Sequence, residues 1–350
     1  MGFLLLIIYS YYCLCRKNIR NMKIVVDNKI PFMKGVIEHF ADEVVYLSGD
    51  EISPEVVHDA DILVTRTRTH CDRDLLEGST VKLIVTATIG YDHIDTAWCE
   101  NAGIKWYNCP GCNANSVATY INNVLTYLNH LRDNEVRTLG VVGVGHVGSI
   151  VARNALDAGL NVICHDPFRD FTESGLPLVS SPLMEIAEKA DVITFHVPLT
   201  KGGPHPTFHM ADASFFGHLR RRPVIINSSR GGVVDEMALL EAMKNGLAGG
   251  AVIDTWENEP NLNRELLDKA LISTPHVAGY SQNGKFNATR MTLQTIARFI
   301  NQTDIPIPGQ PSIEGTTRLS VETLLDDSAH LKSAPERFEY FRNNYPKRIE

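Results

Sequence analysis

The sequence has no apolar run long enough to cross a membrane and no excess of positive charge. Its longest apolar stretch is FLLLIIYSYYCLC, residues 3–15, whereas a membrane-spanning helix needs about 20 residues. Acidic residues outnumber basic ones by 41 to 33, which gives a formal net charge of −8. Such a chain has no overall positive field to attract nucleic acid or an anionic membrane. We therefore expect neither as a partner.

The sequence also has too few cysteines for a disulfide framework. There are seven, an odd number, scattered through 350 residues, which is typical of reduced thiols in a cytosolic protein. Cys109 and Cys112 form a C-x-x-C pair, but a structural zinc site usually needs a second pair at matching spacing. No second pair is present, so we expect no metal site and a cytoplasmic location.

What is present is an ordinary globular composition, 44% hydrophobic and 21% charged, with no tandem repeat or low-complexity segment. At roughly 150 residues per domain, the length predicts about two domains. The apolar start is followed by Arg16, Lys17 and Arg20, whereas a signal peptide carries its basic residues before the apolar run. We expect Met22 to be the true start and residues 1–21 to be a dispensable extension; a weak membrane anchor is the alternative.

Short β-branched runs alternate with amphipathic stretches from Met22 onward, the pattern of parallel α/β folds. We predict two doubly wound parallel-sheet domains joined by a long helix over 113–132, with a further helix over 284–300 and a polar helical run that ends at Glu350. Strands are expected at 23–27, 43–47, 61–65, 82–87, 104–108, 138–143, 161–166, 190–198, 223–229, 249–254 and 271–275, and short helices at 31–40, 53–60, 72–78 and 92–103.

A dinucleotide-binding fingerprint opens the second series. Gly143, Gly145 and Gly148 form G-V-G-H-V-G between a predicted strand and a predicted helix, and Asp166 ends the next strand. The glycines allow the backbone to approach a pyrophosphate, whose charge meets the amides of a helix N-terminus. Asp166 would accept hydrogen bonds from ribose hydroxyls and repel a 2′-phosphate, so the predicted cofactor is NAD. A tight turn without a ligand is the alternative.

Three candidate catalytic residues follow predicted strands of that series: Arg230 in S-S-R-G-G, Glu259 in W-E-N-E-P and His276 in T-P-H-V-A-G. An arginine binds a carboxylate through two parallel hydrogen bonds. A histidine moves a proton near neutral pH, and a nearby carboxylate would orient it and raise its pKa. Each residue alone is more typical of a surface ion pair, but together, beside a dinucleotide site, they favour hydride transfer. His93 and His196 are rival acid–base groups.

These motifs, with N-C-P-G-C-N-A-N-S-V-A and I-N-S-S-R-G-G-V-V-D-E, resemble the D-isomer-specific 2-hydroxyacid dehydrogenases over roughly residues 24–300. The resemblance implies that Arg230, Glu259 and His276 are the catalytic residues of an NAD-dependent enzyme. It also implies that an NAD-binding domain is inserted into a flavodoxin-like substrate domain. A shortened dimerisation segment at the C-terminus, implied by the same resemblance, suggests a homodimer. The expected domains are 22–115 with 276–303 for substrate, 116–275 for NAD and 304–350 for dimerisation.

Within the family, A-T-I-G-Y-D-H-I-D at 87–95 and G-Y-S at 279–281 are most similar to the members that oxidise a phosphorylated 2-hydroxy acid, 4-phosphoerythronate. This likeness places the reaction in pyridoxal 5′-phosphate synthesis. It implies substrate contacts from Arg66, Thr67, Thr88 and Tyr280, and NAD contacts from His146, Val147, Asp254 and Gly279. Two alternatives stay open: a dehydrogenase of glycerate, phosphoglycerate or hydroxypyruvate type, and an NAD-sensing binding module without turnover. Arg66 and Arg68 could also simply pair with surface carboxylates such as Asp72 or Asp74.

Overall fold

The computed structural model describes residues 22–131, 136–169, 171, 175–303 and 314–350. The prediction about residues 1–21 therefore lies outside the described part of the chain. Contacts divide the chain into two compact units, one made of 1–112 with 285–310 and the other of 113–284 with 311–350. Among the described helices, none is long and apolar enough to span a membrane.

Unit 1 (1–112 and 285–310) is built on a five-stranded parallel sheet with strand order β2-β1-β3-β4-β5. All five strands were predicted from the sequence, with ends that differ by at most one residue. They are β1 Lys23–Asp27, β2 Glu43–Leu47, β3 Ile62–Thr65, β4 Leu83–Thr86 and β5 Lys105–Tyr107.

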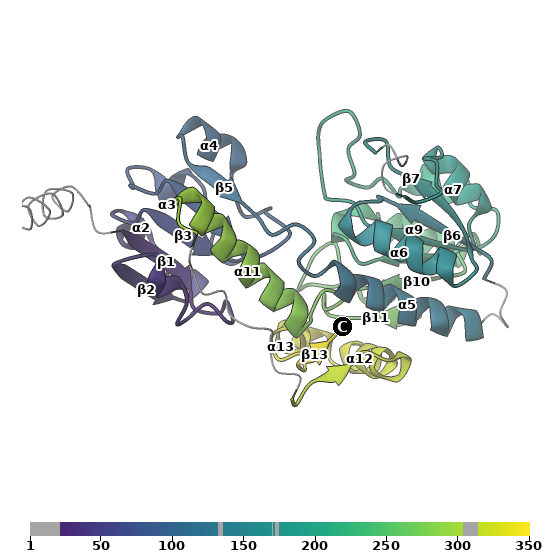
Figure 1. Cartoon of the computed structure of the whole chain (residues 1–350). Helices are drawn as coiled ribbons and strands as arrows, with labels where there is room; N and C mark the ends of the chain where they lie inside the picture. The colour runs from purple at the N-terminus through teal and green to yellow at the C-terminus, as the bar shows by residue number, and fades with distance from the viewer. Residues whose placement is uncertain (1–21, 132–135, 170, 172–174, 304–313) are drawn as a thin grey trace, which may run out of the picture. The chain divides into compact units, whose positions relative to one another are not determined.

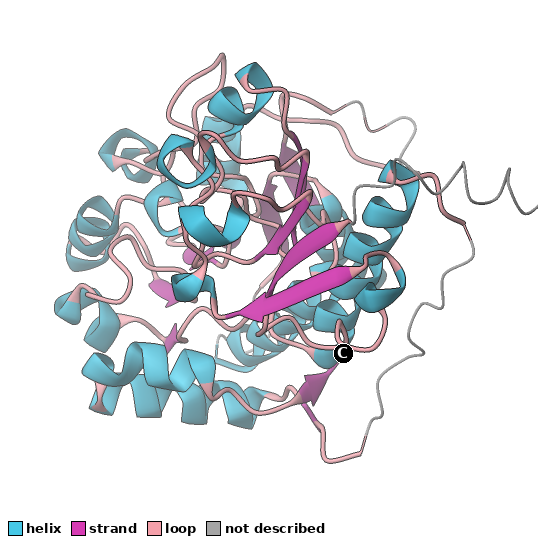
Figure 2. Cartoon of the chain, turned by 90° about the vertical axis from the view of Figure 1, so that its left-hand side faces the viewer, coloured by secondary structure: helices cyan, strands magenta, loops and turns pink. Residues whose placement is uncertain are grey.

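Alternate residues of these strands face two separate apolar cores. Val25, Leu63 and Ile84 pack on one face with residues of three short helices. On the other face, Ile24, Ile62 and Leu83 contact Leu293 and Ile296 of the long helix α11, Gln282–Phe299. Figure 2 shows strands, in magenta, with helices, in cyan, on either side of them. Because both faces are covered, the three inner strands β1, β3 and β4 are buried along almost their whole length, as in other parallel sheets.

The connecting helices of unit 1 are shorter than predicted. The predicted helix over 31–40 is wrong, since only a 3-10 turn at Ile37–His39 forms there. Phe32 and Gly35 have φ of 59° and 90°, values that an α-helix cannot contain. The remaining short elements are the 3-10 turn Gly49–Glu51 and the helices α2 Pro54–Val57, α3 Arg73–Leu76 and α4 Thr96–Asn101.

Unit 2 (113–284 and 311–350) contains a six-stranded parallel sheet with strand order β11-β10-β9-β8-β6-β7. This is a doubly wound order, in which the direction of winding reverses between β6, the first strand of the unit, and β8. The six predicted strands are all present, the last much shortened. They are β6 Thr138–Val142, β7 Asn161–His165, β8 Val192–Phe195, β9 Val224–Asn227, β10 Gly250–Ile253 and β11 Ile272–Ser273.

Helices cover both faces of this sheet. Leu139 and Val141 face a core shared with α5, Ala114–Leu131, and α6, His146–Asp157, and Figure 1 shows both helices along one side of the sheet. Val142 and Ile193 face the opposite core. That core is lined by α7 Leu183–Lys189, α8 Ala213–Gly217, α9 Glu236–Lys244 and α10 Arg264–Lys269, with a 3-10 turn at Gly231–Val233 before α9.

The described part of the C-terminal segment, residues 314–350, belongs to unit 2. Its helix α12, Val321–Ser333, contacts β11 and α5 (Figure 1). A 3-10 turn, Pro335–Arg337, leads into α13, Phe338–Asn343. The prediction of a helical run to Glu350 is wrong at its end, because Arg348–Ile349 form a strand, β13, that pairs with β12, Thr317–Arg318.

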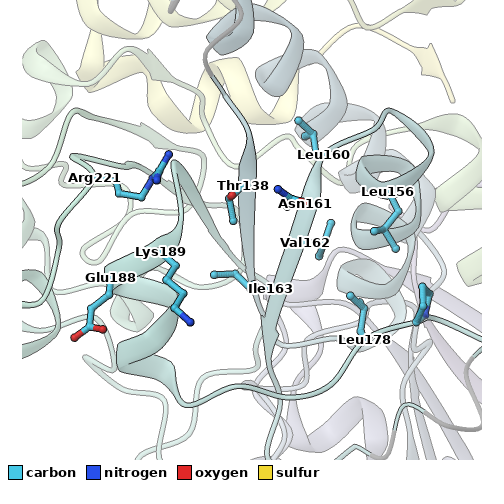
Figure 3. A pocket seen from close by; sticks show the side chains of 11 residues that line it. Thr138, Leu156, Leu160, Asn161, Val162, Ile163, Leu178, Glu188, Lys189 and Arg221 are labelled. Atoms are coloured by element: carbon cyan, nitrogen blue, oxygen red, sulfur yellow. The ribbon is translucent and has the colours of Figure 1, made fainter.

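A surface hollow of about 680 Å³ lies where β6 and β7 begin (Figure 3). Thr138 and Asn161 start those strands, and Lys189 and Arg221 add charge at its border. Ligands of doubly wound sheets bind at the opposite ends of the strands, and the predicted site residues do not line this hollow. We therefore build the candidate site at the strands' carboxyl ends.

Candidate active site

The glycine fingerprint forms a tight turn between β6 and α6. Gly143 has a φ of 85°, a conformation that favours glycine. An added Cβ on Gly148 would lie 2.0 Å from the carbonyl oxygen of Gly143, so only glycine permits α6 to start this close to the strand. Gly145 is the N-cap of α6, with His146 and Val147 in the helix's first turn. The unpaired amides of such a helix start attract an anion.

The space around this turn fits NAD. An added Cβ on Gly145 would meet no atom within 4 Å, so the backbone is open where a pyrophosphate would approach. Asp166, after β7, accepts the amide hydrogens of Val144 at 2.9 Å and Phe168 at 3.1 Å, and its oxygens keep lone pairs for ribose hydroxyls. The hydroxyl of Ser228, after β9, is buried without a protein partner, which is consistent with a polar ligand there.

Arg230 follows β9 in a turn that is fixed by hydrogen bonds. The Asn227 side chain donates to the Arg230 carbonyl at 2.9 Å and accepts from the backbone and hydroxyl of Ser229 at 3.2 and 2.9 Å. The Arg230 guanidinium donates to the Ser229 carbonyl at 2.7 Å. The turn therefore presents a half-buried guanidinium at the carboxyl end of the sheet, and its contact with a substrate carboxylate stays a prediction.

His276 and Glu259 form a close pair. The His276 Nδ1 lies 3.0 and 2.9 Å from the two carboxylate oxygens of Glu259. Burial alone would raise the pKa of Glu259, but the hydrogen bond and charge of His276 and the amide of Trp256 hold that pKa below its ordinary value. An ionised carboxylate only accepts hydrogen bonds, so Nδ1 carries the proton and Nε2 is left as the basic nitrogen.

The rival histidines pair with threonine hydroxyls. The imidazole of His93 pairs with the Thr86 hydroxyl at 3.1 Å, and that of His196 with the Thr194 hydroxyl at 3.0 Å. Loss of hydration lowers the pKa of His93 to about 4 and the pKa of His196 to about 3. Both are neutral at pH 7, because burial outweighs even the charge of Asp92, which acts to raise the pKa of His93. This favours His276 as the acid–base group.

Asp254 holds the loop that carries His276. Its carboxylate accepts from the Thr274 hydroxyl at 2.6 Å and from the amides of Val277 and Ala278 at 2.8 and 3.0 Å. It is 1% exposed, so the bonds it makes here are structural, and its contact with NAD stays a prediction. Gly279 follows directly, and an added Cβ there would lie 2.2 Å from the Asn113 side chain.

The predicted substrate residues of unit 1 lie after β3 and β4. Arg66 does not pair with Asp72 or Asp74; its guanidinium donates to the Lys29 carbonyl at 3.0 Å and lies 3.9 Å from Asp27. Thr67 is exposed. The Thr88 hydroxyl is half-buried, 2.7 Å from that of Thr86, and donates to the Gly90 carbonyl at 2.7 Å. Their contacts with substrate stay predictions.

Arg342 is a further residue of this site that no sequence motif indicates. Its Nη1 lies 3.7 Å from the Glu259 carboxylate, and Tyr280, the predicted substrate residue of unit 2, is among its neighbours. The motif signals could not reveal it, because Arg342 lies in the C-terminal segment, outside the dehydrogenase motifs, and only packing brings it to Glu259.

The C-x-x-C pair is buried in unit 1. The Cys109 thiol donates to the carbonyls of Thr86 and Ala288 at 3.4 and 3.3 Å. Burial raises the pKa of Cys109 to about 11, whereas a reactive thiol needs a lowered pKa. A packing role therefore fits this cysteine better than redox chemistry.

Comparison with known proteins agrees with this geometry. Residues 125–278 match the model described as "D-isomer specific 2-hydroxyacid dehydrogenase, NAD binding domain". The chain is 51% identical over 340 residues to an erythronate-4-phosphate dehydrogenase of Bacteroides thetaiotaomicron, covering 94% of this chain and 97% of that enzyme. The chain belongs to the D-isomer-specific 2-hydroxyacid dehydrogenase family.

Other members of the D-isomer-specific 2-hydroxyacid dehydrogenase family extend the likeness. The erythronate-4-phosphate dehydrogenase of Porphyromonas gingivalis is 38% identical over 346 residues, 93% of this chain and 92% of that one. A D-lactate dehydrogenase of Aquifex aeolicus, solved with NAD and lactic acid, superposes with a TM-score of 0.67 at 25% identity, covering 80% of this chain and 95% of that one.

These findings confirm the predicted fold, family and cofactor. The chain is an NAD-binding 2-hydroxyacid dehydrogenase, and the resemblance to the members that act on 4-phosphoerythronate is confirmed by the names of its relatives. The roles of individual residues rest on the geometry described above.

Proposed function

We propose that this enzyme oxidises 4-phosphoerythronate at C2 to the corresponding 2-oxo acid, with NAD as cofactor, as a step of pyridoxal 5′-phosphate synthesis. The observation that carries the proposal is the likeness to erythronate-4-phosphate dehydrogenases over nearly the whole length of both chains. NAD, when bound, supplies the acceptor for the hydride.

The residues of unit 2 act on the acid itself. Arg230 binds the carboxylate and polarises the C2 oxygen, as the fixed turn after β9 allows. The Nε2 of His276 takes the hydroxyl proton, and Glu259, held at the Nδ1, stabilises the imidazolium that forms. Asp254 keeps His276 in place through the two amides that follow it.

In unit 1, Arg66 and its neighbours bind the phosphate in this proposal. Its guanidinium is about one-third exposed and its carboxylate neighbour Asp27 lies 3.9 Å away, so it can reorient toward a phosphate. Two or three charge-assisted hydrogen bonds to a phosphate favour binding of the phosphorylated acid over the unphosphorylated one by several kcal/mol. Each 1.4 kcal/mol corresponds to about a tenfold ratio of affinities.

The test compares kcat/KM for 4-phosphoerythronate, erythronate, 3-phosphoglycerate and glycerate. We expect 4-phosphoerythronate to exceed erythronate by at least about 100-fold. Arg66→Gln should reduce this ratio, whereas Arg73→Gln, which removes an exposed arginine paired only on the surface with Glu77, should leave it unchanged. Preference for an unphosphorylated acid would reject the substrate, and NAD binding with no turnover of any acid would instead support a sensor.

The homodimer and the cytoplasmic location are further parts of the proposal. The C-terminal segment exposes Leu325 and Tyr340 by 37% and 54%, apolar side chains that a second copy could cover. Light scattering after size exclusion should give a mass of twice the chain's 38.9 kDa.

A further inference from the structure

The C-terminal segment brings a second cation to the catalytic carboxylate. Arg342 on α13 places its Nη1 3.7 Å from the Oε2 of Glu259, the oxygen that lies 2.9 Å from the His276 Nδ1. The Arg342 side chain is 22% exposed and that of Glu259 18%. In such a partly dry environment a charge at this distance matters more than at the surface.

Arg342 is held in place by the packing of its helix. Phe338, one turn earlier on α13, is fully buried in the same core as Trp256 and Leu331. Trp256 is the residue whose amide donates to Glu259 at 2.9 Å. One core therefore fixes both the helix that carries Arg342 and the loop that carries Glu259.

The same segment also makes hydrogen bonds to the loop after His276. The Arg348 Nη2 donates to the Ser116 hydroxyl at 2.8 Å and to the Ala278 carbonyl at 2.5 Å. The Ser281 hydroxyl donates to Glu350 at 2.8 Å. The segment thus contacts Ala278 and Ser281, which lie on either side of Tyr280 in the chain.

We infer that Arg342 is a positioning residue for the dehydrogenase reaction, which shares the Glu259 carboxylate with His276. The Arg342 charge helps to keep Glu259 ionised, and it also repels a protonated His276 imidazole. This repulsion offsets part of the stabilisation that Glu259 gives to the imidazolium. We therefore expect the loss of Arg342 to favour the protonated form of His276, which cannot accept a proton.

Other ionisable groups surround this pair. Glu339 lies 3.8 Å from Arg342 on the same helix. Glu236 accepts the Glu257 amide at 2.7 Å; burial raises its pKa to about 7, with additional contributions from the charges of Glu257 and Glu259. Glu257 is itself paired with His209 at 2.7 Å. Glu236, Glu257 and His209 keep these partners in all the variants below, whereas Glu339 loses its arginine neighbour in Arg342→Gln.

The experiment compares the pH profile of kcat/KM for the parent, Arg342→Gln, Arg342→Lys and Lys347→Gln, using the hydroxy acid that the parent prefers. Loss of the Arg342 charge beside the Glu259–His276 pair should move the acid limb of the Arg342→Gln profile up by about 0.5–1 pH unit, since effective dielectric constants between those of protein and water apply. At a pH on that limb, kcat/KM falls about 3- to 10-fold, and on the plateau it stays within about twofold of the parent.

The two control variants separate the effect of the charge at Arg342 from the effect of losing any positive charge from the C-terminal segment. Arg342→Lys retains the cation and should restore most of the parent profile. Lys347→Gln removes a positive charge from an exposed position of the same segment and should give the parent profile. A rise of KM at all pH values with an unmoved acid limb would overturn the inference.

A measurement without substrate keeps the inference independent of turnover. The imidazole of His276, identified by its absence from the spectrum of His276→Gln, can be titrated by NMR in the free enzyme. In Arg342→Gln its midpoint should rise by the same 0.5–1 unit, and an unchanged midpoint in a folded variant contradicts the inference. An inactive parent would reject the proposed function but leave this measurement valid.

Discussion

At the residue scale, the chemistry depends on how one carboxylate is surrounded. Glu259 receives the Trp256 amide, both short contacts of His276 and the more distant charge of Arg342. Because its pKa lies below the ordinary value despite burial, it stays ionised at neutral pH. It can therefore fix the His276 tautomer and stabilise its charged form.

Replacing His276 with Gln should lower kcat by about 10²–10⁴, the usual contribution of a general acid–base group. NAD affinity, measured by fluorescence titration, should stay within about twofold of the parent. His58→Gln is the matched control, since that histidine is exposed in unit 1. A near-normal kcat in the His276 variant would return the acid–base role to His93 or His196.

Asp166→Ala should narrow the preference for NAD over NADP by about tenfold or more. The substitution removes a ribose acceptor and a charge that repels a 2′-phosphate, and such a repulsion is worth roughly 1–4 kcal/mol at contact distance. The measurement is the ratio of kcat/KM for the two cofactors. Asp157→Ala, at the exposed end of α6, should leave this ratio unchanged; equal use of both cofactors by the parent would contradict the role of Asp166.

At the element scale, the site depends on how closely α6 approaches β6. The helix starts three residues after Gly143, and the Gly148 backbone lies against the carbonyl of Gly143 with no room for a side chain. This contact orients the first amides of α6 toward the open space around Gly145. A helix displaced from the strand would no longer hold its amides in that orientation.

Gly148→Ala should destabilise the enzyme by about 1–3 kcal/mol, the usual cost of overpacking, and weaken NAD binding. The added Cβ would meet backbone, which cannot yield as a flexible side chain does. Urea unfolding and NAD titration measure the two effects. Gly217→Ala in α8, where an added Cβ meets nothing within 4 Å, should be nearly neutral, and equal effects of both substitutions would reject this explanation.

At the scale of the whole molecule, the C-terminal segment completes the core of unit 2. Leu331 and Phe338 are fully buried among residues of the Rossmann sheet's helices and loops. The segment therefore contributes to the stability of the dehydrogenase unit within one chain, whatever it does between two chains.

Phe338→Ala should reduce the free energy of unfolding by about 3–5 kcal/mol, as expected for a buried phenylalanine. Asn343→Ala, at the exposed end of the same helix, should change it by less than about 1 kcal/mol. Urea denaturation of both variants provides the comparison. Similar losses in the two would mean that the segment is not anchored through Phe338.

Stability should also fall on acidification because His93 is buried in its neutral form. Its pKa is about 4 in the folded protein against 6.5 ordinarily, so the unfolded chain binds the extra proton between these values and stability is lost as the pH falls below about 6.5. From pH 7 to pH 5 this one group should cost about 2 kcal/mol. His93→Gln should lose about that much less than the parent over the same interval in urea unfolding, whereas the exposed His58→Gln should match the parent.

The sequence by itself determined the strands, the glycine turn and the position of the candidate catalytic residues after the ends of strands. A buried parallel strand is a short run of β-branched residues, and such a run, with its bounding turns, is visible locally, as at 23–27 and 138–143. The fingerprint is also local, since the turn needs its glycines wherever it occurs. For the same reason Arg230, Glu259 and His276 could be chosen before their side chains were placed.

Only the tertiary structure decided the length of the unit 1 helices, the strand formed by Arg348–Ile349 and the surroundings of Glu259. The apolar residues of 31–40 fit a helical period, but left-handed backbone at Phe32 and Gly35 lets them pack on the sheet without one. Arg342 carries no motif, and its proximity to Glu259 follows from the burial of Phe338 in a core that distant segments build together. Local pattern encodes an element, whereas a contact between distant elements depends on the packing of them all.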